Sequence, residues 1–108
     1  MPESERQRIV LETCLRLDAP FCWRTRGTLL VAGDEVVRVI KELQTLGYRV
    51  AGCEGFLIEG RSISPQLDLI FDASSRWDGK SASEVVGDWP EGVWVDLNVL
   101  PQKTAGAA

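Results

Sequence analysis

Residues 49–72, RVAGCEGFLIEGRSISPQLDLIFD, contain two runs rich in apolar residues on either side of Glu59-Gly60. Glycine at the second position of a two-residue turn accepts a positive φ, so the segment predicts a β-hairpin that turns at Glu59-Gly60. In this register Phe56 faces Ile63. Side chains alternate along a strand and cross-strand partners share a face, so the register predicts which side chains lie together.

The predicted register divides the hairpin into an apolar face and a more polar face. The apolar face collects Val50, Phe56, Ile58, Ile63, Leu67, Leu69 and Phe71. The polar face collects Ala51, Cys53, Leu57, Ser62, Ser64, Gln66, Asp68, Ile70 and Asp72. This division indicates an antiparallel sheet that is covered on one side only.

Glu54 is the exception, because it falls on the apolar face opposite Pro65. Pro65 has no backbone N–H and indicates an edge position or a bulge. Glu54 is then either a carboxylate at the sheet rim that reaches water or a buried carboxylate. The flanking Gly52 and Gly55 indicate an irregular strand and favour the rim.

Two segments have the periodicity of amphipathic helices. Residues 4–17 begin with Ser4 and Gln7, spaced as a capping box. Residues 34–46 begin with Asp34 as the expected N-cap and precede Gly47, which suits the C′ position. Residues 21–31 predict a strand or, alternatively, two short strands around Arg26-Gly27. If that strand lies parallel to the next one, a right-handed crossover follows.

Residues 92–100 predict the last strand, with an alternating pattern. Its inner set is Val93, Val95, Leu97 and Val99, and its outer set is Trp94, Asp96 and Asn98. Residues 73–90 form a polar loop in which residues 81–86 have the length of one helical turn. Trp77 and Trp89 lie in this loop; we expect them to pack on the body, and the alternative is recognition of a partner.

Together these segments predict a two-layer α+β domain over residues 1–101, with 102–108 as a disordered tail. Two helices cover one face of a mostly antiparallel sheet of about four strands, in the order α-β-α-β-β-β. The other face of the sheet is open.

Composition excludes several classes of function. The 108 residues have a net charge of −4, a pI near 4.8 and no histidine. Residues 50–108 carry a net −5, whereas nucleic-acid binding needs clustered Lys and Arg. Three cysteines without framework spacing predict a reduced, cytoplasmic protein. No signal peptide or membrane span is expected.

The remaining candidates for chemistry are carboxylates. Asp68, Asp72 and Asp96 share the outer sheet face, with Trp94 and Asn98 beside them. This face is a solvated acidic surface, a binding face for a basic protein with Ile70 and Leu57 as apolar contacts, or a Ca²⁺ or Mg²⁺ site. The metal alternative is the weakest, because closely spaced loop carboxylates are missing. Arg24 and Arg26 are expected to neutralise this face, and the alternative is bidentate binding of an anionic group.

The sequence Glu54-Gly55-Phe56, followed by Ile63-x-Pro65-x-x-Asp68-x-Ile70-x-Asp72-x-Ser74, resembles small bacterial immunity-type proteins of polymorphic or contact-dependent toxin systems. The resemblance covers about a quarter of the chain. It implies a neutralising protein that binds a basic toxin domain through an acidic surface. It assigns no binding residue.

The sequence favours a non-enzymatic protein-binding module, and it predicts no cofactor and no bound metal. The candidate binding residues are Glu54, Asp68, Asp72, Trp77, Trp89, Trp94, Asp96 and Asn98. The alternatives are a small-ligand or divalent-metal domain with a carboxylate site, and a homodimer that uses the open face.

Overall fold

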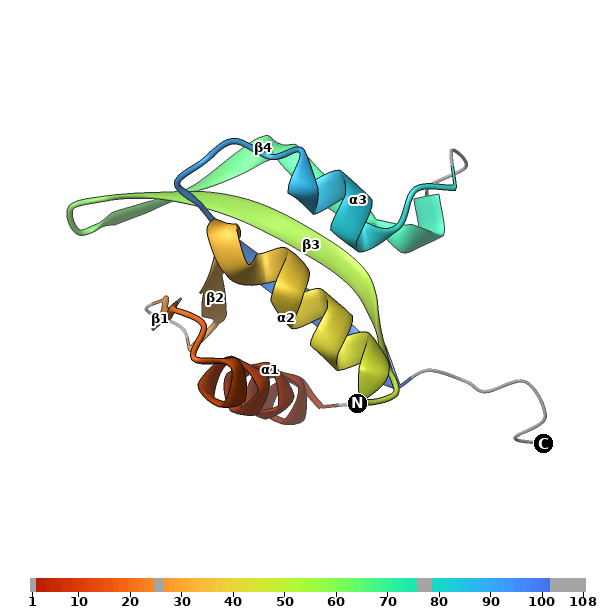
Figure 1. Cartoon of the computed structure of the whole chain (residues 1–108). Helices are drawn as coiled ribbons and strands as arrows, with labels where there is room; N and C mark the ends of the chain where they lie inside the picture. The colour runs from red at the N-terminus through yellow and green to blue at the C-terminus, as the bar shows by residue number, and fades with distance from the viewer. Residues whose placement is uncertain (1, 25–26, 76–78, 102–108) are drawn as a thin grey trace.

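The computed structural model describes residues 2–24, 27–75 and 79–101. Its helices are α1 (Glu3–Leu17), α2 (Gly33–Thr45), the short 3-10 helix η1 (Ala73–Ser75) and α3 (Ala82–Gly87). Its strands are β1 (Phe21–Trp23), β2 (Leu29–Ala32), β3 (Tyr48–Glu59), β4 (Ser62–Asp72) and β5 (Val93–Pro101). Figure 1 shows the elements in chain order.

The strands form one five-stranded sheet in the order β1-β2-β5-β3-β4, and every neighbouring pair is antiparallel. The α+β class and the antiparallel sheet are therefore confirmed. Residues 21–31 adopt the alternative of two short strands, which raises the strand number from about four to five. Because no described pair is parallel, no right-handed parallel crossover forms. The observed order is α-β-β-α-β-β-α-β.

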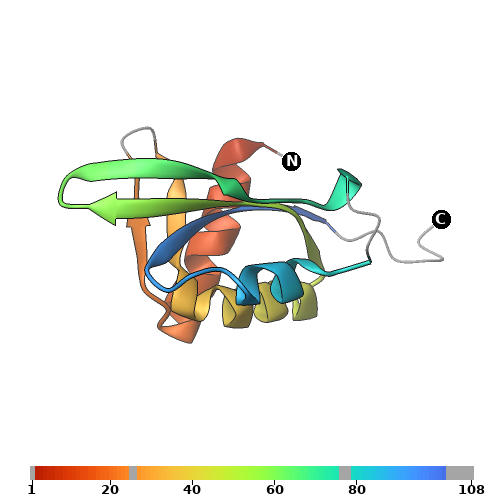
Figure 2. The same cartoon turned by 90° about the horizontal axis from the view of Figure 1, so that it is seen from above.

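Three α-helices, instead of the predicted two, pack on one side of the sheet. Figures 1 and 2 show α2 and α3 on the same face of β3, β4 and β5. The core on that face joins Val10 and Cys14 of α1, Val39 of α2 and Val86 of α3 with the inward side of the sheet. The predicted inner set of the last strand is buried as expected: Val93, Val95, Leu97 and Val99.

The helix ends agree only in part with the capping signals. Gly47 follows α2 with φ +93°, as expected for a C′ glycine. The residues at the N-caps of α1 and α2 are Pro2 and Ala32, and neither makes a side-chain capping bond. The capping box is found instead at α3, where Ser81 Oγ accepts from the Glu84 N–H at 3.3 Å.

The hairpin register differs from the prediction. Glu59 pairs with Ser62, so the turn residues are Gly60 and Arg61, and Phe56 faces Pro65. Beyond Gly55 the register shifts again, and residues 67–69 of β4 have no partner on β3. A second irregularity at Ala51 interrupts the β3–β5 ladder.

These shifts change which hairpin side chains face the helices. Cys53 and Leu57 pair with the buried Leu97 and Val93 and lie on the inner face, although the sequence placed them outside. Phe56 and Ile58 lie on the opposite, outer face, where Phe56 pairs with Trp94. The prediction for these four side chains is therefore wrong.

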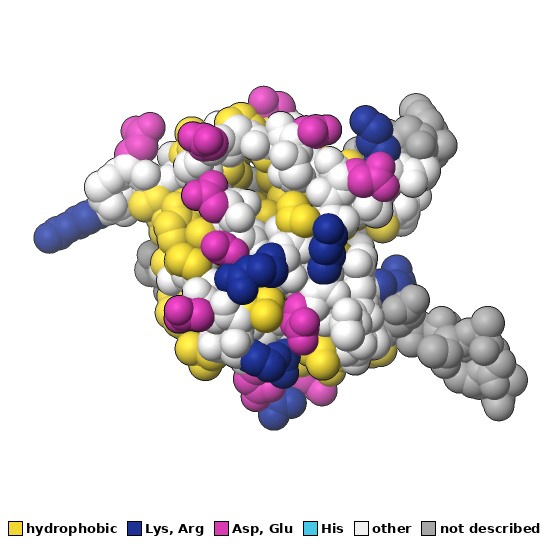
Figure 3. Space-filling view, in the orientation of Figure 1, with side chains coloured by type: hydrophobic (Ala, Val, Ile, Leu, Met, Phe, Trp, Pro, Cys, Tyr) yellow, Lys and Arg dark blue, Asp and Glu magenta, His cyan; other side chains and the backbone are white. Residues whose placement is uncertain are grey.

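The helix-bearing surface carries interleaved charges. Figure 3 shows Lys and Arg side chains next to Asp and Glu side chains across this face. Arg38 Nε lies 2.8 Å from Glu35 Oε2, and Arg16 Nε lies 3.8 Å from Glu42 Oε1. Charges on this side are thus partly neutralised within the chain.

Gly55 provides a test of the observed register. A Cβ at this position would lie 2.8 Å from Leu69 Cβ and 3.1 Å from Val93 Cγ1. Overpacking of this kind typically costs about 1–3 kcal/mol, so we expect Gly55→Ala to lower the free energy of unfolding by that amount in urea denaturation. The control is Gly52→Ala, whose Cβ would meet nothing closer than 3.4 Å. Equal stability of the two variants would contradict the observed register.

Candidate functional site

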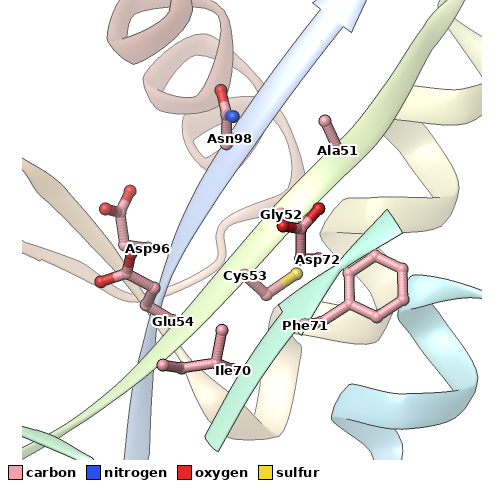
Figure 4. Close-up of a pocket in the computed structure, with 9 residues that line it drawn as sticks. All are labelled: Ala51, Gly52, Cys53, Glu54, Ile70, Phe71, Asp72, Asp96 and Asn98. Carbon is pink, nitrogen blue, oxygen red and sulfur yellow. The ribbon is translucent and has the colours of Figure 1, made fainter. Parts of the chain in front are cut away.

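The outer face of the sheet brings together two carboxylates from its longest ladder. Glu54 of β3 pairs directly with Asp96 of β5. Figure 4 shows the two side chains next to one another on the same face. Glu54 is exposed, as the rim interpretation predicts, but it lies on an inner strand and its partners are Asp96 and Ile70 instead of Pro65.

A hollow of about 230 Å³ opens on this face between β5, β3 and the end of β4. It is lined by Ala51, Gly52, Cys53, Glu54, Ile70, Phe71, Asp72, Asp96 and Asn98. A second hollow of about 210 Å³ shares Glu54, Asp96 and Asn98 and extends toward α1. The acidic pair is therefore accessible from two directions.

Asp96 has an unusual electrostatic environment. It is partly buried, and burial together with the neighbouring Glu54 raises its pKa to about 6. Glu3 adds to this effect, while Arg24 and Arg6 oppose it. Like charges opposite each other on neighbouring strands are destabilising, so the pair weakens the folded state near neutral pH.

Helix α1 closes one end of the site, which the sequence did not indicate. β2 pairs with β5 only at Val31 and Ala32, and before them the Leu29 N–H donates to Gln7 Oε1 at 2.9 Å. Arg6, which directly precedes Gln7 in α1, donates from Nη1 to Asn98 Oδ1 at 2.7 Å and forms an ion pair with Glu3. The ion pair with Glu3 thus neutralises part of the positive charge that Arg6 presents to Glu54 and Asp96.

An aromatic ring lies beside the acidic pair. Phe56 is only 1% exposed although it lies outside the helix-side core, and the Arg24 guanidinium carbon lies 4.5 Å from its ring centroid. Phe56 is two residues from Glu54 on the same strand, so both side chains lie on the outer face. Arg26, the other arginine that was predicted to neutralise the acidic face, is outside the described residues.

The other predicted residues are dispersed. Asp72 lines the hollow, and its Oδ1 accepts from the Ser74 N–H at 3.0 Å and from Ser74 Oγ at 2.7 Å, which lowers its pKa. Asp68 lies in the unpaired 67–69 segment and does not line either hollow. Trp89 packs against the helix-side core, as preferred from the sequence, and Trp77 is outside the described residues.

The site offers neither a histidine base nor an accessible thiol nucleophile. The chain contains no histidine. Cys53, expected to be the most accessible thiol, is 1% exposed, and burial together with Asp96 raises its pKa to about 12. Such a thiol stays protonated at neutral pH. What the outer face does offer is attraction for a cation.

The described residues contain no group of three or more His, Cys, Asp or Glu that fits a metal ion. None of their helices combines the length and apolar character needed to cross a membrane.

Comparison of the chain with protein-family models, curated proteins and solved structures finds no match.

The Asp96 environment predicts a pH-dependent stability. Because its folded pKa of about 6 exceeds the ordinary value of 3.8, the folded state takes up a proton as pH falls through 6. We expect the free energy of unfolding to rise by about 1 kcal/mol between pH 7 and pH 5. Asp72 and Glu3, whose pKa values are lowered, would reduce stability only below about pH 4.5.

Urea denaturation at pH 7 and pH 5 measures this change. Asp96→Asn should remove the rise, whereas Asp88→Asn, at an exposed position, should retain it. A rise that persists unchanged in Asp96→Asn would show that another group is responsible.

Proposed function

We propose that this protein is a non-enzymatic binding module that holds a basic protein partner on the outer face of its sheet. The observation that supports it best is the Glu54–Asp96 pair. Within residues 2–24, 27–75 and 79–101, no basic side chain forms an ion pair with either carboxylate. A lysine or arginine from a partner would relieve the repulsion between the two carboxylates, so binding of a basic partner at this pair is favourable.

Apolar side chains around the hollow suit a protein partner. Ile70, in the wall of the hollow, is 50% exposed. Trp94 lies on the same face and is partly buried. Protein interfaces combine apolar anchors with a polar rim, and tryptophan is frequent among the residues that contribute most to affinity.

The resemblance to immunity-type proteins agrees with this surface. Glu54, Ile70 and Asp72, which carry part of the resemblance, line the hollow, and Phe56 and Pro65 form a cross-strand pair on the outer face. We therefore infer that the basic partner is a toxin domain that this protein neutralises. The acidic residues would then act by occupying and covering basic groups of the toxin.

Self-association through the open face is the main competing function. The free edge at β4 is poorly suited to pairing, because Pro65 and the irregular 67–69 segment interrupt it. The face itself would place like charges near one another in many pairings of two copies. A basic partner therefore fits the charges of this face better.

The test compares three immobilised baits in lysate of the source organism. They are the wild type, a site variant (Glu54→Gln, Asp72→Asn, Asp96→Asn) and a charge-matched control (Glu12→Gln, Asp88→Asn, Glu91→Gln). We expect the wild type and the control to retain the same basic protein at low salt and to lose it at high salt. The site variant should bind it at least about 10-fold more weakly, since charge pairs at interfaces contribute more than 1 kcal/mol each.

Equal retention by all three baits would place the interface elsewhere. Light scattering of the free protein completes the test, because a stable dimer whose formation is weakened by the site variant would favour self-association.

A further inference from the structure

The position of Arg24 indicates which kind of cation the outer face recognises. Its guanidinium lies over the Phe56 ring, in the geometry of a cation–π contact. The ring is buried beneath it, and Glu54 and Asp96 form the next cross-strand pair along the same face. A stacking surface and two carboxylates therefore lie side by side; we call Phe56, Glu54 and Asp96 the arginine corner.

Arg24 uses only half of this corner. Its charge acts on Asp96, but no ion pair joins it to either carboxylate of the corner. A guanidinium can stack on an aromatic ring and also donate two parallel hydrogen bonds to a carboxylate, whereas an ammonium group offers a point charge. The corner thus suits a guanidinium better than an ammonium group.

We propose that the arginine corner binds an arginine of the protein partner, and that Arg24 occupies the stacking position in the free protein as a built-in competitor. This inference rests on the proposed function and adds the chemistry of the partner's side chain. The incoming arginine stacks on Phe56 and reaches Glu54 and Asp96. Arg24 rotates away toward solvent.

The backbone around Arg24 allows this exchange. The Arg24 N–H donates to the Thr28 carbonyl at 2.8 Å, and the Arg24 carbonyl accepts from the Gly27 N–H at 2.9 Å. These two hydrogen bonds hold the main chain of Arg24 in place. Displacement requires only rotation of the Arg24 side chain and the loss of one cation–π contact. The contact should therefore weaken the affinity for the incoming arginine by roughly two- to five-fold.

The experiment titrates the folded protein with hexa-arginine amide and hexa-lysine amide and follows the amides of Glu54, Phe56 and Asp96 by NMR. We expect the wild type to prefer the arginine peptide. Arg24→Ala should raise arginine-peptide affinity by roughly two- to five-fold and lysine-peptide affinity by less, because the freed ring favours a guanidinium. Arg61→Ala, at the exposed hairpin turn, makes the same charge change and should leave the preference unaltered.

Phe56→Leu keeps an apolar side chain but removes the π face, and it should bring the two affinities close together. Equal wild-type affinities for the two peptides would overturn the guanidinium preference. An Arg24→Ala effect that matches Arg61→Ala for both peptides would overturn the role of Arg24 and leave the proposed function intact. The absence of any shift at Glu54 and Asp96 with either peptide would overturn both proposals.

Discussion

The ladder between β3 and β5 determines where both faces of this protein lie. It runs from the Tyr48–Pro101 pair to the Leu57–Val93 pair, with one irregularity at Ala51. On one side it aligns apolar residues of β5 with the helices. On the other it places Glu54 opposite Asp96. The helix-side core and the acidic pair are thus two consequences of the same hydrogen-bonded register, and a change of register would alter both.

The two faces contribute to stability in opposite directions. The inner face buries a continuous set of apolar side chains from three helices and four strands, which is the dominant favourable contribution to folding. The outer face keeps two like charges adjacent, one of them partly buried. Natural proteins tolerate such local costs at functional sites, because a core of this kind compensates for them. This is the physical reason for connecting the outer face with binding.

Part of this arrangement follows from the sequence and part does not. The alternation of β5 correctly predicted which face Trp94 and Asp96 occupy, since a regular strand needs only local information. The predicted register of the hairpin was wrong, because the turn lies one residue later, residues 67–69 are unpaired and Ala51 interrupts the β3–β5 ladder. These features depend on pairing between segments that are distant in the sequence. Arg6 could not be assigned to the site, because it comes from a helix 92 residues away from Asn98 in the chain.

The fold holds the Glu54 and Asp96 carboxylates together on an accessible face. A direct measurement is a carbon-detected NMR titration of the Asp96 carboxyl group in the wild type and in Glu54→Gln. We expect an Asp96 pKa of about 6 in the wild type and a lower value in Glu54→Gln that still exceeds 3.8, since burial, the larger cause, persists. An Asp96 pKa at its ordinary value, unaffected by Glu54→Gln, would show that the fold does not hold the two carboxylates together.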